Sequence, residues 1–159
     1  MIMSQSKSGF SLKKIIVSTD GSENAKRAFE AACLLAKQNG SELLVVHVVS
    51  EALPAQYAPI GINEPVADYT AYFNSVEQKG KELVNATVSE AQKAGVNATG
   101  EVLRTIASPV EAILEASDRY HANLIVVGTR GLGGFKKLFL GSVSNGIVSH
   151  ATCSVLVVR

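Results

Sequence analysis

Five short runs rich in valine, isoleucine and leucine alternate along the chain with longer stretches in which apolar residues recur every three or four positions. This alternation is typical of βαβ units built around a parallel sheet. The runs cover residues 15–17, 43–49, 102–103, 124–127 and 155–158, and the third is the weakest. Nearly continuous apolar runs are expected of strands that are covered on both faces. The sequence therefore predicts an α/β fold with five strands.

Four helices are predicted between these runs. The first ends at Asn39 and Gly40, and the second spans residues 65–94, with Gly95 just beyond its end. The third begins with Ser108 as its N-cap and Pro109 at its first position, and ends near His121. The fourth covers residues 142–150, and the one unusually long loop covers residues 50–64, for which mobility and a role as a lid are both open.

Composition narrows the class of protein. A chain of 159 residues that is 47% hydrophobic and 18% charged is expected to form one domain over 1–159, with a flexible N-terminus at 1–11. Lysine and arginine number 15 against 14 acidic residues, and no basic block exceeds two residues, which argues against nucleic acid as a partner. The polar start and the lack of a run of ~18 apolar residues predict a cytoplasmic protein without membrane contact.

Cys33 and Cys153 have no metal-ligand spacing, and we expect both to be buried free thiols.

Two segments stand where a parallel sheet places its ligands, beyond the carboxyl ends of the strands. The first contains Asp20 and follows the first run. The second begins at Gly128, is rich in glycine, and leads to Gly141 and Ser142 at the start of the last helix. Glycines permit positive φ and close approach of a ligand, and a helix N-terminus attracts anions. Three basic residues, Arg130, Lys136 and Lys137, add positive charge, so the segment suits a phosphate chain.

The spacing of the glycines resembles a known nucleotide motif. Neither the Walker A pattern nor G-x-G-x-x-G after the first strand is present. Gly128-x2-Gly131-x9-Gly141-Ser142 instead matches G-x2-G-x9-G-[ST], the pattern of the ATP-binding branch of the universal stress protein family. The resemblance extends from Lys13 to Arg159. It implies a Rossmann-like sheet of order 3-2-1-4-5, related to the adenine nucleotide alpha hydrolases, with helices on both faces.

The resemblance also implies a site. By position, Asp20 and the backbone of Val48 would hold the adenosine end of ATP, and Gly128 would lie against the ribose. The phosphates, with Mg²⁺, would be held by Gly131, Gly141, Ser142, Val143 and Ser144. No catalytic residue and no protein metal ligand is implied.

Simpler interpretations of the same residues remain open. Asp20 can be only a helix cap, with Glu23 three residues on, and Ser142 can likewise be only an N-cap. The three basic residues named above can form a solvated loop. His47 is more typical of a hydrogen-bonded core histidine than of a ligand, and His150 is favoured near a helix C-terminus by the helix dipole.

Three functions follow as hypotheses. The first is a cytoplasmic ATP-binding stress-response protein that acts as a nucleotide-dependent regulator. The second is a slow ATPase, which is disfavoured because neither Asp nor Glu occurs between Gly128 and Arg159. The third is a nucleotide-free dimeric interaction protein, against which the intact glycine pattern argues. In the implied strand order, residues 154–158 form an apolar edge, which predicts a homodimer through antiparallel pairing of this strand.

Overall fold

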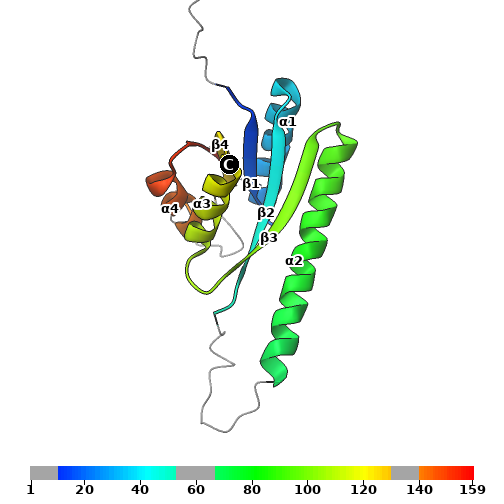
Figure 1. The fold of residues 1–159 in the computed structure, drawn as a ribbon, viewed down its shortest axis with the longest axis vertical. Helices are drawn as coiled ribbons and strands as arrows, with labels where there is room; N and C mark the ends of the chain where they lie inside the picture. The colour runs from blue at the N-terminus through cyan, green and yellow to red at the C-terminus, as the bar shows by residue number, and fades with distance from the viewer. Residues whose placement is uncertain (1–10, 53–66, 130–139) are drawn as a thin grey trace, which may run out of the picture.

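The computed structural model describes residues 11–52, 67–129 and 140–159 (Figure 1). Strands and helices alternate in it as the sequence predicts. The strands are β1 (Lys14–Ser18), β2 (Glu42–Ser50), β3 (Asn97–Thr105), β4 (Leu124–Gly128) and β5 (Ser154–Val158). The helices are α1 (Glu23–Asn39), α2 (Ala67–Lys93), α3 (Pro109–Tyr120) and α4 (Ser142–His150). Most of the predicted long loop and of the predicted flexible N-terminus lies outside these ranges.

The five strands form one parallel sheet of order β3-β2-β1-β4-β5, which confirms the predicted topology. Helices α1 and α2 cover one face, and α3 and α4 cover the other (Figure 1). Successive residues of each strand point to opposite faces, so the core has two halves. Ile15 and Val17 of β1 pack with α1, whereas Ile16 packs with α3 and α4.

Serine side chains cap the starts of α1 and α3, and of these two caps the sequence predicts Ser108. Ser22 and Ser108 are the N-caps of α1 and α3, and each side chain accepts a hydrogen bond from a backbone amide of the first turn. Gly40 is the C-cap of α1 at φ 64°. His121 is the C-cap of α3 in the left-handed conformation at φ 56°.

Strand β3 is much longer than the two residues that the sequence predicts. It spans nine residues, and all nine are in register with β2, from Glu42 opposite Asn97 to Ser50 opposite Thr105. Its first half, Asn97 to Gly100, lacks apolar alternation, and Gly100 packs against α2. A Cβ on Gly100 would lie 2.3 Å from Val84 Cγ1 of α2. Close packing of α2, rather than local strand propensity, therefore decides the length of β3.

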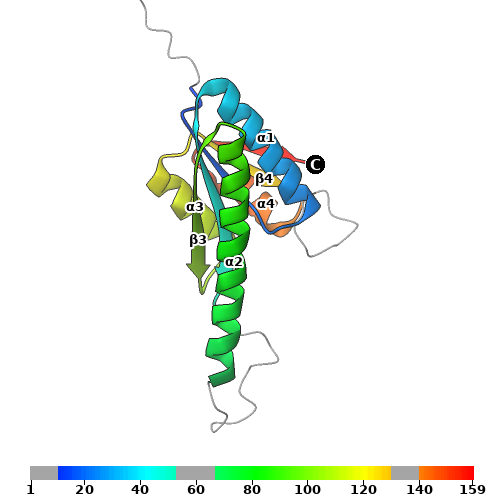
Figure 2. The ribbon, with the colours of Figure 1, turned by 90° about the vertical axis from the view of Figure 1, so that its right-hand side faces the viewer.

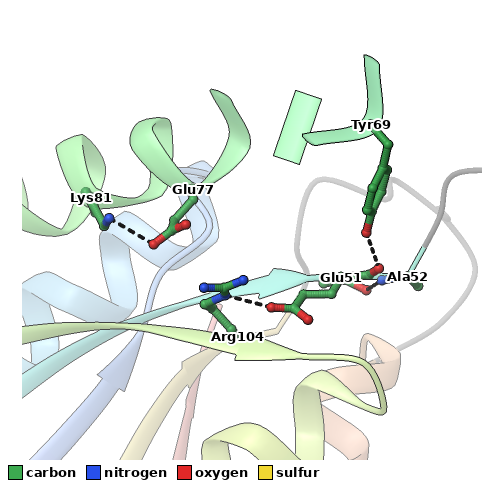
Figure 3. Close-up of polar contacts among 7 residues, drawn as sticks. Glu51, Ala52, Tyr69, Glu77, Lys81 and Arg104 are labelled. Carbon is green, nitrogen blue, oxygen red and sulfur yellow. Dashed lines mark hydrogen bonds and ion pairs between the residues drawn. The ribbon is translucent and has the colours of Figure 1, made fainter. Parts of the chain in front are cut away.

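Helix α2 lies alongside β3 (Figure 2), and β2 and β3 continue past the end of β1. Two contacts join the first turns of α2 to the ends of β2 and β3, and an ion pair joins these two strand ends to each other; Figure 3 shows the Tyr69 contact and the ion pair. The Tyr69 hydroxyl donates to the Glu51 carbonyl across 2.6 Å, and Arg104 Nε lies 2.6 Å from Glu51 Oε1. The Arg104 guanidinium also lies 4.8 Å from the centre of the Phe73 ring. Within α2, Lys81 pairs with Glu77 one turn away at 2.8 Å.

The two cysteines are less buried than the sequence predicts. Cys33 and Cys153 are free, as predicted, but both are half-buried rather than fully buried. Burial, together with the nearby charge of Glu90, raises the pKa of the Cys33 thiol to about 11.

Over 11–52, 67–129 and 140–159, no helix has both the length and the apolar character needed to span a membrane.

Candidate functional site

The segment after β1 forms a tight turn that presents Asp20 at the carboxyl edge of the sheet. The Thr19 amide continues the ladder to β2 by donating to the Val46 carbonyl at 2.9 Å. The Ser22 amide donates to Asp20 Oδ1 at 3.0 Å, which closes an Asx turn. Gly21, at φ 80°, occupies the left-handed region in the middle of this turn.

Asp20 is not the N-cap of α1, which corrects one of the simpler interpretations. Ser22 is the cap, and its Oγ accepts from the Ala25 amide at 3.2 Å. The carboxylate of Asp20 instead orients the turn that leads into the helix. A capping role for Ser22 leaves Asp20 at the carboxyl end of β1, where the sheet is expected to bind ligands.

His47 is the hydrogen-bonded core histidine that the sequence favours. Its side chain is half-buried, and its Nδ1 lies 2.8 Å from the Thr19 carbonyl oxygen. The ring therefore joins the middle of β2 to the turn that holds Asp20. Thr19 is the residue that sequence reasoning missed, although its position directly after a buried strand was a usable signal.

The backbone of Val48 lies where β2 continues beyond the end of β1. Pairing between the two strands ends at Ser18 opposite Val46, and the Val46 carbonyl faces β1, since it accepts from Thr19. Backbone groups of alternate residues in a parallel strand point to the same neighbour, so those of Val48 also point to the β1 side. Val48 thus presents a donor and an acceptor past the end of β1. Its side chain packs with the core on the α3 and α4 face.

Gly128, at the end of β4, is packed against the first turn of α1. A Cβ at this position would lie 2.8 Å from both the carbonyl carbon and the carbonyl oxygen of Asn24. Of the two properties that the sequence suggested for glycines in this segment, positive φ does not apply to Gly128, because only Gly21, Gly40 and Gly95 have positive φ among the described glycines. Contact with α1 requires the glycine instead. It brings the end of β4 beside the helix that follows the Asp20 turn.

Helix α4 starts at the same edge. Gly141 is its N-cap, so Ser142 is the first helical residue and not the cap, which corrects the other simple interpretation. Gly141 has φ −67° and ψ 161°, which any residue can adopt, so positive φ does not apply to this glycine either. No side chain caps this end in the part of the chain that the structure covers. The amides of the first turn are thus without the usual side-chain acceptor.

Two hydrogen bonds join the start of α4 to the end of β4. The Gly141 amide donates to the Thr129 carbonyl at 2.7 Å, and Ser144 Oγ donates to the Gly128 carbonyl at 2.5 Å. Thr129 is also tied to β5, since its amide donates to the Val158 carbonyl at 2.8 Å. Both ends of the glycine-rich segment are therefore fixed to the sheet.

The three α4 residues of the predicted site differ in what they offer. Ser142 is exposed at the first helical position, and Val143 is half-buried against the core, so it offers only its backbone. Ser144 is buried, and its single hydroxyl hydrogen is used on Gly128. Its side chain therefore holds the helix in place, and only its amide remains for an anion.

Other predicted site features fall outside the described residues. These are Gly131 and the basic residues Arg130, Lys136 and Lys137. Among the residues that the structure does describe, no group of three or more His, Cys, Asp or Glu side chains could hold a metal ion. At this edge, the structure brings together the turn that carries Asp20, the backbone of Val48, Gly128, and the start of α4.

Comparison of the sequence with known proteins identifies the family of this chain. Residues 11–159 match the sequence model of the universal stress protein family. The chain is 35% identical over 147 residues to the universal stress protein YxiE of Bacillus subtilis, covering 92% of this chain and 98% of that protein. It is 38% identical over 149 residues to a Thermus aquaticus universal stress protein, with the same two coverages.

Solved structures show the same fold. Universal stress protein UspA from Lactobacillus plantarum superimposes with a TM-score of 0.78 at 22% identity, covering 94% of this chain and 99% of that one. An Archaeoglobus fulgidus protein in complex with dAMP has a TM-score of 0.65 at 23% identity, with coverages of 92% and 98%. An Arabidopsis thaliana protein with AMP bound has a TM-score of 0.63 at 24% identity, with coverages of 92% and 90%. The match over 11–159, with relatives above 30% identity along nearly their whole length, shows that this chain belongs to the universal stress protein family.

Proposed function

We propose that this chain binds ATP, as its Mg²⁺ complex, at the carboxyl edge of the sheet, and that it acts in the cytoplasm as a nucleotide-dependent regulator of a stress response. One observation carries the proposal. The start of α4, which no side chain of the described residues caps, is bonded to the end of β4 by Gly141 and Ser144, beside the helix that follows the Asp20 turn. The three elements meet at the place where parallel sheets bind nucleotides.

The phosphate end of the proposed site is built from backbone amides. The first-turn amides of α4 point out of the helix N-terminus, where the helix dipole favours negative charge. Gly131 and Gly141 have no side chain, so phosphates can approach the backbone closely. Mg²⁺ would be carried on the phosphates, which agrees with the absence of a carboxylate after Gly128.

The adenosine end rests on Asp20 and Val48. The backbone of Val48 offers an N–H and a C=O side by side, which suits the donor and acceptor on the edge of adenine. Asp20 offers a carboxylate, which suits ribose hydroxyl groups. AMP, found in one family member, shares the adenine, the ribose and the first phosphate with ATP, and dAMP, found in another, shares the adenine and the first phosphate.

Calorimetry with ATP and AMP tests the proposal. Gly141→Val places a branched side chain against the phosphates without straining the backbone, because φ −67° and ψ 161° are open to any residue. We expect this variant, and Gly131→Val, to lose ATP binding while the circular dichroism spectrum stays native. Wild-type affinity in both variants would show that the phosphates are not held here.

A homodimer is part of the proposal, and strand β5 supports it. β5 lies at one edge of the sheet, and all four of its apolar residues are only half-buried. Val155 and Val157 lean toward the α3 and α4 face, whereas Leu156 and Val158 lean toward α1. Pairing with the β5 of a second copy would satisfy the free backbone edge and bury these side chains.

A further inference from the structure

The ring of His47 makes a hydrogen bond whose direction is fixed by chemistry. Its Nδ1 lies 2.8 Å from the carbonyl oxygen of Thr19. A carbonyl oxygen can only accept, so Nδ1 carries the hydrogen and donates. In the neutral ring, Nε2 is then the nitrogen without a hydrogen.

This bond completes the attachment of Thr19 to β2. The Thr19 amide donates to the Val46 carbonyl at 2.9 Å, and the Thr19 carbonyl accepts from the next residue of β2, His47. Thr19 is only 5% exposed, so water has little access to its backbone. Removing the His47 donor would leave a buried carbonyl without this partner, which is costly.

The Thr19 carbonyl belongs to the same planar peptide unit as the amide of Asp20. Fixing the direction of that carbonyl therefore fixes the direction in which the chain enters Asp20. The turn that follows depends on this entry, because the Ser22 amide donates to Asp20 Oδ1 and the Gly21 amide donates to Thr19 Oγ1 at 3.3 Å. The His47 ring thus orients the carboxylate of Asp20 through one peptide unit.

Helix α2 holds the ring from the other side. A Cβ on Gly80 would lie 2.8 Å from His47 Cδ2 and 3.4 Å from Nε2. The backbone of α2 is therefore packed directly against the imidazole, and Gly80 is buried in this contact. The ring is confined between α2 and the turn, so a shift of either is transmitted to the other.

We propose that His47 is a positioning residue for nucleotide binding, which holds the Thr19 carbonyl and thereby the Asp20 turn, with Gly80 holding the ring. The inference rests on the proposed nucleotide site. His47 does not contact the nucleotide in this account. It acts through Thr19 and Asp20.

Three variants separate the hydrogen bond from mere packing. His47→Leu removes the donor, whereas His47→Asn keeps an amide N–H near the position of Nδ1. His150→Leu is the matched control, because the His150 Nδ1 also lies 2.9 Å from a carbonyl, that of Gly146, at the far end of α4. Two properties are measured in each: amide hydrogen exchange at Ser22 without nucleotide, and the affinity for AMP by calorimetry.

His47→Leu is expected to speed exchange at Ser22 and to weaken AMP binding, each by about tenfold, the effect of losing one buried hydrogen bond. His47→Asn should restore both properties, and His150→Leu should change neither. In the otherwise wild-type protein, Gly80→Ala should speed exchange at Ser22 and weaken AMP binding as His47→Leu does, because the new methyl group displaces the ring. In the His47→Asn background it should have no effect, since the shorter side chain leaves room.

Unchanged exchange and affinity in His47→Leu would overturn the inference, as would a His47→Asn variant as defective as His47→Leu. Failure of the proposed function looks different. If the wild-type protein binds no AMP, the nucleotide site is wrong, and exchange at Ser22 alone decides whether His47 holds the turn.

Discussion

Ser144 donates its hydroxyl hydrogen to the carbonyl of Gly128 across 2.5 Å, and this bond attaches the first turn of α4 to the last residue of β4. The two residues are 16 positions apart, and Ser144 is buried. Gly128 also contacts the first turn of α1. One serine hydroxyl therefore helps to set the position of the α4 amides relative to the Asp20 turn.

Ser144→Ala is expected to lower the free energy of unfolding by about 1–2 kcal/mol, because the Gly128 carbonyl loses its partner. ATP affinity should fall as well, because α4 is held less firmly. Urea unfolding and calorimetry measure the two effects. Ser149→Ala is the matched control, since the Ser149 hydroxyl bonds only to the Asn145 carbonyl within α4. Equal losses in the two variants would contradict a special role for Ser144.

ATP hydrolysis is expected to be slow. Backbone amides can stabilise charge on the phosphates, but neither Asp nor Glu follows Gly128 to act as a base or bind the metal ion. Turnover should lie far below the ~10 s⁻¹ that is typical of enzymes, as measured by phosphate release. A rate in the ordinary range that is lost in Asp20→Asn would instead support the ATPase hypothesis.

Val157→Lys is expected to convert the dimer to a monomer in sedimentation experiments at micromolar concentration, because it places a charge in the paired β5 edge. Ile106→Lys is the control. Ile106 is 79% exposed just after β3, at the opposite edge of the sheet, so its replacement should leave the dimer intact. A wild-type monomer, or a Val157→Lys variant that dimerises normally, would show that β5 is not the interface.

Stability is expected to fall at alkaline pH through Tyr120. Burial, together with the charge of Glu42, raises the pKa of this phenol from 10.0 to about 12 in the folded protein. Between these values the unfolded chain releases the proton and the folded chain keeps it, so folding loses free energy as pH rises. Below pH 10 the contribution is fully present. Urea unfolding at pH 8 and pH 11 should show a smaller loss in Tyr120→Phe than in the wild type, and equal losses would contradict the assignment.

Local patterns were sufficient for most of the fold. The apolar run at β4 and the serine cap of α3 are short-range signals, because each depends on residues within one turn or one strand. The length of β3 was not predictable in this way. Gly100 suits neither strand nor helix by itself, and it lies in a strand because Val84 and Val88 of α2 pack against it.

By itself, the sequence determined the order of elements, the parallel sheet and the presence of Asp20, Gly128 and Gly141 at its carboxyl edge, because periodicity and spacing are encoded locally. Only the tertiary structure decided what each residue does there. Gly128 is required by contact with α1 and not by its φ, and the Ser144 hydroxyl is used on a strand end. His47 reaches a carbonyl 28 positions away. Such roles depend on which groups come into contact with which backbone groups once the chain has packed. Residues adjacent in the sequence carry no signal of these contacts.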